Sequence, residues 1–178
     1  MRKIIVYVAT SADGFIARPD GDVGWLDRPR PKGNYGMAAF YKSVDTVLMG
    51  RKTYEVALKF GQEFYTGKKN YVFSRRRRRA AAPGVEFVSG PIGDFARELC
   101  GGEGKDVWLV GGGGLTASFL DEGLIDEFIV HVVPVFIGEG IPLVGPRRRS
   151  VPLRLLSSRA YPDGVVRLHY SVTRPTDA

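Results

Sequence analysis

The sequence predicts a single α/β domain over residues 1–178, built on a mixed, mostly parallel sheet of about eight strands. Short apolar runs alternate with segments of helical periodicity, which is typical of strands covered on both faces by helices. The last two runs instead alternate apolar and polar residues around a Pro-Asp-Gly turn, as an antiparallel hairpin does. No repeat and no long linker divides the chain, so one domain is expected.

The apolar runs place the individual elements. Strands are expected over residues 3–9, 45–50, 70–74, 85–89, 106–110 and 126–138, with the hairpin over 153–172. Pro134 inside the sixth run indicates a bulge or an unpaired edge. Helices are expected over residues 34–43, capped by Asn34, over 52–61, ended by Gly61, and over 92–100 and 115–123. Residues 10–33 are rich in glycine, proline and aspartate and predict an extended loop.

Composition excludes several classes of protein. The net charge of +7 is concentrated in Arg75–Arg79 and Arg147–Arg149; without these eight arginines, 18 basic residues face 19 acidic ones. No RNA-binding module surrounds either cluster, so nucleic acid is not an expected partner. Cys100 is the single cysteine and excludes an intrachain disulfide, and with two histidines no metal site is expected. The chain shows neither a signal peptide nor an apolar run near the roughly 18 residues of a membrane span, which predicts a cytoplasmic protein without a membrane partner.

Three strand ends carry residues suited to phosphate. Residues 50–53 place a glycine turn and then Arg, Lys and Thr at a helix start, where unpaired N–H groups attract anions. Ser74 and Arg75 offer a hydroxyl and a bidentate donor. Residues 111–114 are four glycines before another helix, and they allow a phosphate to approach the backbone, most closely at Gly112 and Gly113. Each feature alone is also typical of a turn or a solvated surface, but together they predict a dinucleotide at the carboxyl edge of the sheet.

The spacings exclude two common nucleotide motifs. "GRKT" lacks the glycine-rich loop of a Walker A sequence, because a single residue separates Gly50 from Lys52. The glycine run follows the fifth strand and not the first, unlike a Rossmann fingerprint. Arg and Lys stand where NAD binding would favour an acidic residue, which predicts NADPH as the cofactor.

The sequence resembles the dihydrofolate reductase-like family, most closely the branch that contains the reductase domain of riboflavin biosynthesis and its small stand-alone relatives. The resemblance covers nearly the whole chain and rests on "VATSADGFIARPDGDVGWLD", "DTVLMGRKTYE", "YVFSR" and "LVGGGGLTASFLDEGLIDEFIVHVVPVFIGEGIPL". It implies a three-layer α/β/α sandwich and an NADPH-dependent reductase of a small heterocyclic or carbonyl substrate, pyrimidine- or pterin-like. Dihydrofolate reductase and 5-amino-6-(5-phosphoribosylamino)uracil reductase are examples. The alternative is a nucleotide-binding or basic nucleic-acid-interacting module that has kept the fold without turnover.

The resemblance also implies the cofactor contacts. The nicotinamide carboxamide would be held by backbone groups, and the phosphates by glycines, helix N-termini and basic side chains. The residues concerned are Val8, Ala9 and Ile16 for the carboxamide, Gly50, Arg51, Lys52 and Thr53 for the pyrophosphate and adenosine side, Ser74, Arg75 and Arg76 for the 2′-phosphate, and Val110, Gly111, Gly112, Gly113, Gly114, Leu115 and Thr116 for the second pyrophosphate cradle.

The substrate side is less well defined. Dihydrofolate reductases carry a carboxylate in the first helix, and residues 34–43 contain none, so folate reduction is not implied. We expect the pocket wall to include Trp25, Tyr35, Phe40 and Phe136, and the proton donor to be Asp13, Asp27, Tyr35 or water. Trp25 also fits a loop anchor, Asp13 a turn residue and His131 a structural strand residue. Uncovered apolar sheet, together with the pairing common among relatives, makes a homodimer the expected assembly.

Overall fold

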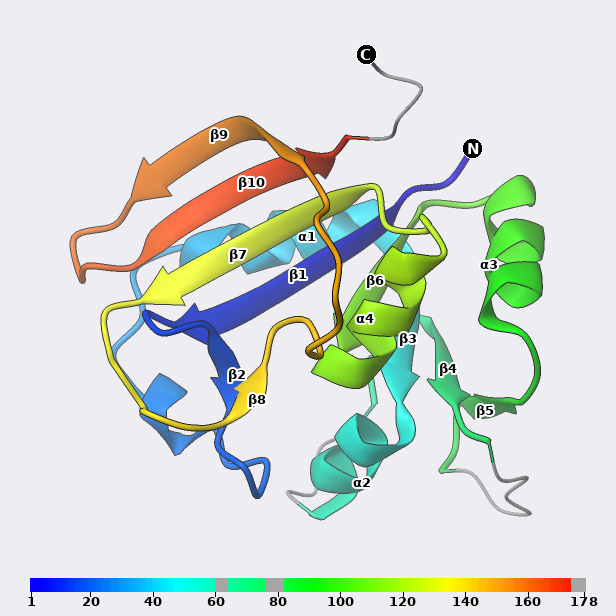
Figure 1. Ribbon diagram of the computed structural model, residues 1–178, viewed down its shortest axis with the longest axis horizontal. Helices are drawn as coiled ribbons and strands as arrows, with labels where there is room; N and C mark the ends of the chain where they lie inside the picture. The colour runs from blue at the N-terminus through cyan, green and yellow to red at the C-terminus, as the bar shows by residue number, and fades with distance from the viewer. Residues whose placement is uncertain (60–63, 76–81, 174–178) are drawn as a thin grey trace.

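The computed structural model describes residues 1–59, 64–75 and 82–173, and eight strands of this part form one sheet. The strands are β1 (Ile4–Ser11), β3 (Val44–Gly50), β4 (Lys69–Phe73), β5 (Val85–Val88), β6 (Asp106–Gly111), β7 (Glu127–Val133), β9 (Leu153–Ala160) and β10 (Val166–Val172). Their order is β5-β4-β3-β6-β1-β7-β10-β9 (Figure 1). The six strands from β5 to β7 are parallel, whereas β10 is antiparallel to both of its neighbours. The predicted mixed sheet and its C-terminal hairpin are therefore confirmed.

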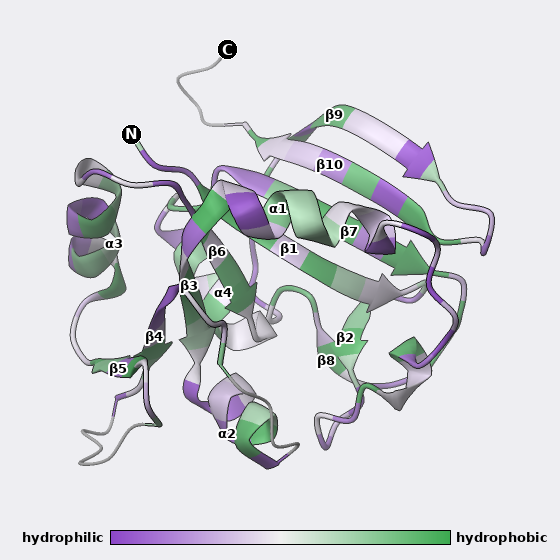
Figure 2. Cartoon of the chain, turned by 180° about the vertical axis from the view of Figure 1, so that it is seen from behind, coloured by the Kyte–Doolittle hydropathy of each residue, from purple (hydrophilic) through white to green (hydrophobic). Residues whose placement is uncertain are grey.

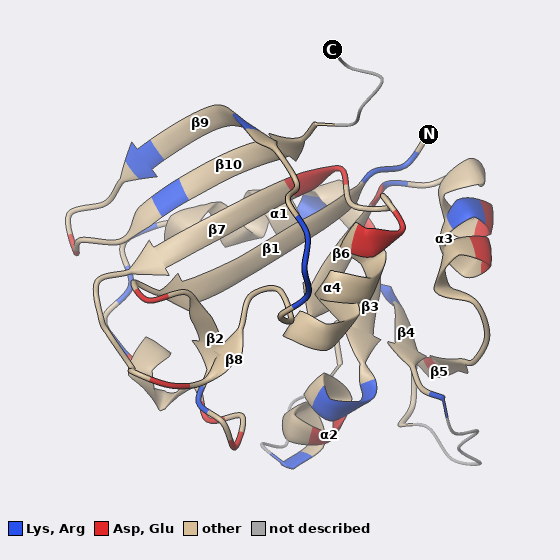
Figure 3. Ribbon diagram, in the orientation of Figure 1, with Lys and Arg blue, Asp and Glu red and all other residues tan. Residues whose placement is uncertain are grey.

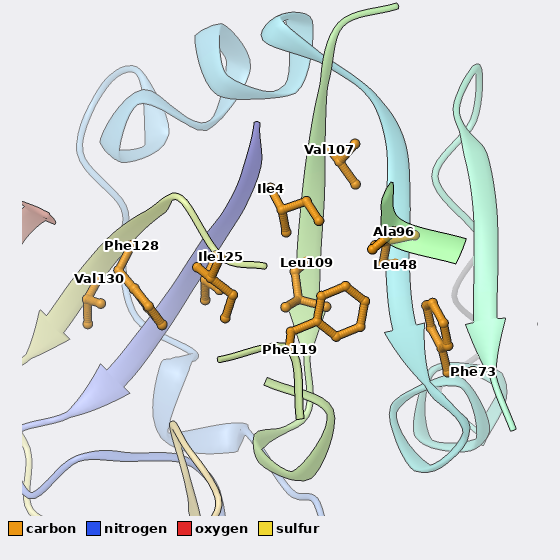
Figure 4. Packing of buried hydrophobic residues seen from close by; sticks show 11 residues of the cluster. Ile4, Leu48, Phe73, Ala96, Val107, Leu109, Phe119, Ile125, Phe128 and Val130 are labelled. Carbon is orange, nitrogen blue, oxygen red and sulfur yellow. The ribbon is translucent and has the colours of Figure 1, made fainter. Parts of the chain in front are cut away.

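Helices cover both faces of the sheet. Helices α3 (Ile92–Gly101) and α4 (Gly113–Asp121) pack on one face, where Ala96 and Phe119 join the buried cluster drawn in Figure 4. Helices α1 (Met37–Ser43) and α2 (Arg51–Lys59) pack on the other, where Phe40 and Tyr54 contribute to a second cluster. Figure 2 shows α1 crossing in front of the sheet on this side. Three layers with two apolar interfaces follow from strands whose successive side chains point to opposite faces.

The central strands separate toward their carboxyl ends. The pairing of β1 with β6 covers Ile4–Val6, while its pairing with β7 continues to Ser11. Beyond Val6, the β6-facing edge of β1 therefore has no strand partner among the described residues. At this end of the sheet, the backbone groups of β1 and the glycines after β6 do not pair with each other as strands.

A small two-stranded sheet joins the loop after β1 to the segment after β7, near the point where the strands separate. Strand β2 (Phe15–Ala17) pairs with β8 (Ile141–Pro142), and Figure 1 shows the pair below the carboxyl end of β1. The backbone N–H of Leu143 donates to Gly14 O, and that of Gly145 donates to Gly113 O. The segment after β7 thus ties the first loop to the glycine turn.

Several local expectations were wrong. Strand β7 ends at Val133 and does not bulge at Pro134, because the Val135 N–H donates back to Val133 O and turns the chain. Residues 10–33 contain β2 and a 3-10 turn at Gly24–Leu26, and are not all loop. Helix α1 starts at Met37 with Gly36 at its N-cap, and Asn34 caps nothing. Gly61, expected to end α2, lies outside the described residues.

Candidate cofactor and substrate site

Four neighbouring strand ends bring the predicted cofactor residues into one row. In the order of the sheet, Ser74 follows β4, Gly50 ends β3, Gly111 ends β6, and Ala9 lies near the end of β1. Strands are spaced about 4.8 Å apart, so the row from β4 to β1 spans roughly 14 Å. An extended dinucleotide matches this arrangement, since its phosphates and its nicotinamide lie at separate points along one line.

Glycines let the two helix starts approach each other. A side chain on Gly50 would place its Cβ 3.7 Å from Gly111 O, and one on Gly112 would lie 3.4 Å from Thr53 Oγ1. Gly111 has a φ of 106°, which residues with a side chain rarely adopt, and the Gly111–Gly112 peptide is cis. The N-termini of α2 and α4 therefore lie next to one another.

The glycines of the turn have different surroundings. A Cβ on Gly113 would lie 2.2 Å from Pro142 O, so this residue packs against the segment after β7. A Cβ on Gly114 would meet nothing within 4 Å. In the first turn of a helix, N–H groups have no intrahelical acceptor, so the open side of the turn offers donors to an anion. Gly113 thus packs against Pro142, whereas Gly112 and Gly114 form the side of the turn that a ligand could approach.

The remaining residues of this cradle lie behind the glycines. Leu115 and Thr116 both donate their backbone N–H to Gly112 O, and the Thr116 hydroxyl donates to the same oxygen at 3.3 Å. Thr116 is buried, and Val110 is partly buried in the α1 face cluster. These three residues shape the turn and do not present free side-chain donors to a ligand.

The first turn of α2 is basic where helices usually favour acidic residues. Arg51 pairs with Glu55 at 2.8 Å, Lys52 is exposed, and the turn contains no acidic residue. Figure 3 shows this basic start of α2 directly after β3. A cation at the positive, N-terminal end of a helix is unfavourable by a few tenths of a kcal/mol or more, unless a nearby anion offsets its charge. Glu55 offsets the charge of Arg51, so the exposed Lys52 is the basic side chain of this turn that a bound phosphate would neutralise.

The end of β4 provides a further pair of donors. Ser74 is buried, and its backbone N–H donates to Val88 O at 3.0 Å, which fixes the end of the strand. Arg75 follows directly and is exposed. Arg76 and the rest of the arginine run fall outside the described residues.

The residues expected at the nicotinamide lie beside the free edge of β1. Val8 and Ala9 are beyond the end of the β1–β6 pairing, and Ile16 lies on β2 with its Cδ1 3.9 Å from the Cβ position of Gly112. The Tyr7 carbonyl on this strand accepts the Trp108 Nε1–H at 3.1 Å. Backbone groups after Tyr7 on this edge therefore have no partner in β6.

The substrate candidates are scattered. Tyr35 packs over the sheet and its hydroxyl donates to Asp163 in the hairpin turn. Phe40 is buried and stacks on Tyr7 with ring centroids 4.2 Å apart, so it helps to fix the position of the Tyr7 ring. Phe136 is 79% exposed on the loop after β7. Trp25 is partly buried, and its Nε1 has no hydrogen-bond partner among the described residues.

The proton-donor candidates differ in protonation state. Hydrogen bonds from Ser11 and from the backbone N–H groups of Gly138 and Ile137 hold the pKa of Asp13 below its ordinary value. Burial, and then the hydrogen bond to Asp163, raise the pKa of Tyr35. Asp13 is therefore ionised at neutral pH and acts as a loop anchor, whereas Tyr35 keeps its proton. Asp27 is exposed at the end of the 3-10 turn.

His131, expected only as a structural strand residue, lies beside these residues as a buried polar group. His131 on β7 packs between Tyr7 and Tyr35, with ring centroids 4.8 and 5.8 Å away. Arg167 pairs with it in register from β10. No sequence signal could have found this pair, because the two residues meet only through the pairing of two strands.

Comparison with known proteins identifies relatives of this chain. The family model of the RibD C-terminal domain matches residues 92–167. The uncharacterized protein YwjB of Bacillus subtilis is 38% identical over 170 residues, covering 95% of this chain and 97% of that protein. A crystal structure of a putative riboflavin biosynthesis protein from Shewanella sp. PV-4 is 30% identical, with a TM-score of 0.86, covering 97% and 99% of the two chains.

The chain belongs to the RibD C-terminal domain family. Dihydrofolate reductase from Enterococcus faecalis, in a complex with NADP(H) and RAB-propyl, shares the fold of this family member at 14% identity, with a TM-score of 0.71 and 97% of each chain covered. The predicted dihydrofolate reductase-like sandwich is thus confirmed, and the chain is related to reductase domains. No helix in the described residues is long and apolar enough to cross a membrane.

Proposed function

We propose that the protein is an NADPH-dependent reductase of a small heterocyclic or carbonyl substrate, pyrimidine- or pterin-like. The observation that carries this proposal is the row of strand ends, because it sets anion donors at two helix starts between a Ser-Arg pair and a free strand edge. Arg75 with Ser74 would bind the 2′-phosphate, the starts of α2 and α4 the diphosphate, and Val8 and Ala9 the nicotinamide.

The residues present fit this cofactor. A Cβ on Gly50 would lie 3.7 Å from Gly111 O and one on Gly112 3.4 Å from Thr53 Oγ1, so the two turns face each other closely, and the first turn of α2 is basic. When bound, NADPH supplies the hydride, while the chain orients the reactants and limits water. The substrate would lie on the α1 face of β1, against Tyr7 and Tyr35. Tyr35 keeps its proton at neutral pH but donates it to Asp163, so it would have to release that hydrogen bond before donating to a substrate oxygen.

A cofactor titration tests the proposal. Adding the protein to NADPH should enhance and blue-shift the nicotinamide fluorescence, with a dissociation constant in the micromolar range, and NADH should bind more weakly. Absorbance at the nicotinamide band then measures oxidation of NADPH in the presence of 5-amino-6-(5-phosphoribosylamino)uracil or dihydrofolate.

The same assay separates this function from the alternative. Failure to bind NADPH, together with tight and salt-sensitive binding of single-stranded RNA, would identify a basic nucleic-acid-interacting module. Binding of NADPH without oxidation by any carbonyl or heterocyclic compound would identify a nucleotide-binding module.

A further inference from the structure

One buried imidazole in the fold has an unpaired nitrogen, although the ring hydrogen-bonds to the backbone of Tyr35 and Val8. His131 is 4% exposed, and its Nε2 makes no hydrogen bond to any described residue. Burial lowers its pKa, so the ring is neutral and carries one donor and one acceptor nitrogen. Leaving such a nitrogen unpaired is destabilising, which is unusual for a purely structural residue.

A second unpartnered nitrogen lies on the next strand. Arg167 is the register partner of His131 across β7 and β10, so both side chains point to the α1 face. The Nε of Arg167 is also buried without a partner among the described residues. On the other side of His131, the register partner is Ala9, one of the residues placed at the nicotinamide. The two nitrogens therefore lie one and two strands away from the proposed hydride donor.

Aromatic rings and a left-handed turn cover this position. Tyr35 lies over His131 and has a φ of 57°, within a turn in which Gly33, Asn34 and Gly36 also have positive φ. A residue with a side chain is strained in this left-handed region of the backbone. Hydroxyl groups hold the turn in place, because Tyr7 and Tyr161 both donate to Tyr35 O. Such backbone strain is concentrated at functional sites.

We propose that His131 Nε2 and Arg167 Nε bind a hydrogen-bond acceptor of the substrate ring, with Tyr7 and Tyr35 as the flanking walls. This inference rests on the proposed reductase function and assigns the specificity-determining residues of the same site. Because Nε2 is out of contact with solvent, the substrate can reach it only when the hydrogen bonds from Tyr7 and Tyr161 to Tyr35 O open. His131 is then a substrate-binding residue and not part of the core.

The two histidines of the chain allow a direct test. In protein labelled with ¹⁵N in the imidazole rings, His169 is an internal control, because it lies on the same face and bonds to Glu127 at 2.8 Å. His169→Gln assigns the two sets of signals. The probes are 5-amino-6-(5-phosphoribosylamino)uracil and dihydrofolate at millimolar concentration, with and without NADPH. We expect one of them to shift the Nε2 resonance of His131 while His169 is unchanged.

Variants separate binding from packing. His131→Phe keeps an aromatic ring between the two tyrosines but should lower the affinity for the probe about tenfold, which corresponds to the loss of one hydrogen bond. His131→Gln, which retains a polar nitrogen, should restore part of the affinity, while NADPH affinity stays unchanged in both. A purely structural histidine would instead lower the melting temperature without changing probe affinity.

The outcomes distinguish this inference from the function on which it rests. A shifted His131 resonance without NADPH oxidation would contradict the reductase assignment but leave the binding residues standing. NADPH oxidation with an unshifted His131 resonance, or no shift with either probe, overturns the inference.

Discussion

Arg75→Ala should weaken NADPH binding by about 10- to 100-fold and leave NADH binding nearly unchanged. The reason is that a charge-assisted hydrogen bond to a phosphate contributes about 1.5–3 kcal/mol, and NADH lacks the 2′-phosphate. Arg75 is exposed directly after buried Ser74, so its removal leaves no buried group without a partner. Nicotinamide fluorescence titrations of the two cofactors at the same ionic strength measure the effect.

A matched variant controls for net charge. Arg97 is an exposed arginine on α3 that pairs with Asp94, on the face of the sheet opposite α2. Arg97→Ala removes the same charge and should leave the affinity for both cofactors within about twofold. Equal losses for NADPH and NADH in Arg75→Ala would show that Arg75 does not bind the 2′-phosphate.

Gly113→Ala should lower the free energy of unfolding by about 1–3 kcal/mol, as expected for overpacking against a rigid neighbour. The new methyl group would lie 2.2 Å from Pro142 O, and this contact is with backbone, which cannot rotate away. The Gly145 N–H bond to Gly113 O holds the same two segments together, so strain there also loosens the β8 segment. Urea unfolding followed by circular dichroism measures the change.

The neighbouring glycine is the matched control. Gly114 lies in the same helix turn, and its Cβ position is open. Gly114→Ala should therefore stabilise the protein by about 0.5–1 kcal/mol, because alanine favours the helix and keeps its N–H. If both variants were equally stable, the glycine turn would not be packed against Pro142 in solution.

The layered fold was readable from sequence because its strands are covered on both faces. Continuous apolar runs such as Ile4–Val6 are typical of buried parallel strands, and the alternation from Val166 to Val172 is typical of a hairpin. The end of β7 was missed because "VPVF" continues the apolar pattern, although proline cannot donate to a ladder. Strand order was not readable, since pairing depends on contacts distant in sequence.

The phosphate-binding half and the substrate half of the site also differ in how far they could be predicted from the sequence. The phosphate-binding candidates are local features, because a strand end followed by glycine and a basic helix start are adjacent in the chain. His131 on β7 looks like a core residue by its alternation with Ile129 and Val133. Its meeting with Arg167 depends on the β7–β10 register, and its cover depends on a left-handed turn at Tyr35. Neither feature leaves a pattern within one segment.

The proposed function depends most on NADPH lying across the strand ends with its phosphates at separate sites. Phosphorus NMR of NADPH bound to the protein tests this directly, because the 2′-phosphate and diphosphate resonances are resolved. Both should shift on binding, and in Arg75→Ala the diphosphate shift should persist while the 2′-phosphate returns toward its free position. Diphosphate resonances that stay at their free positions at saturating protein would contradict the account.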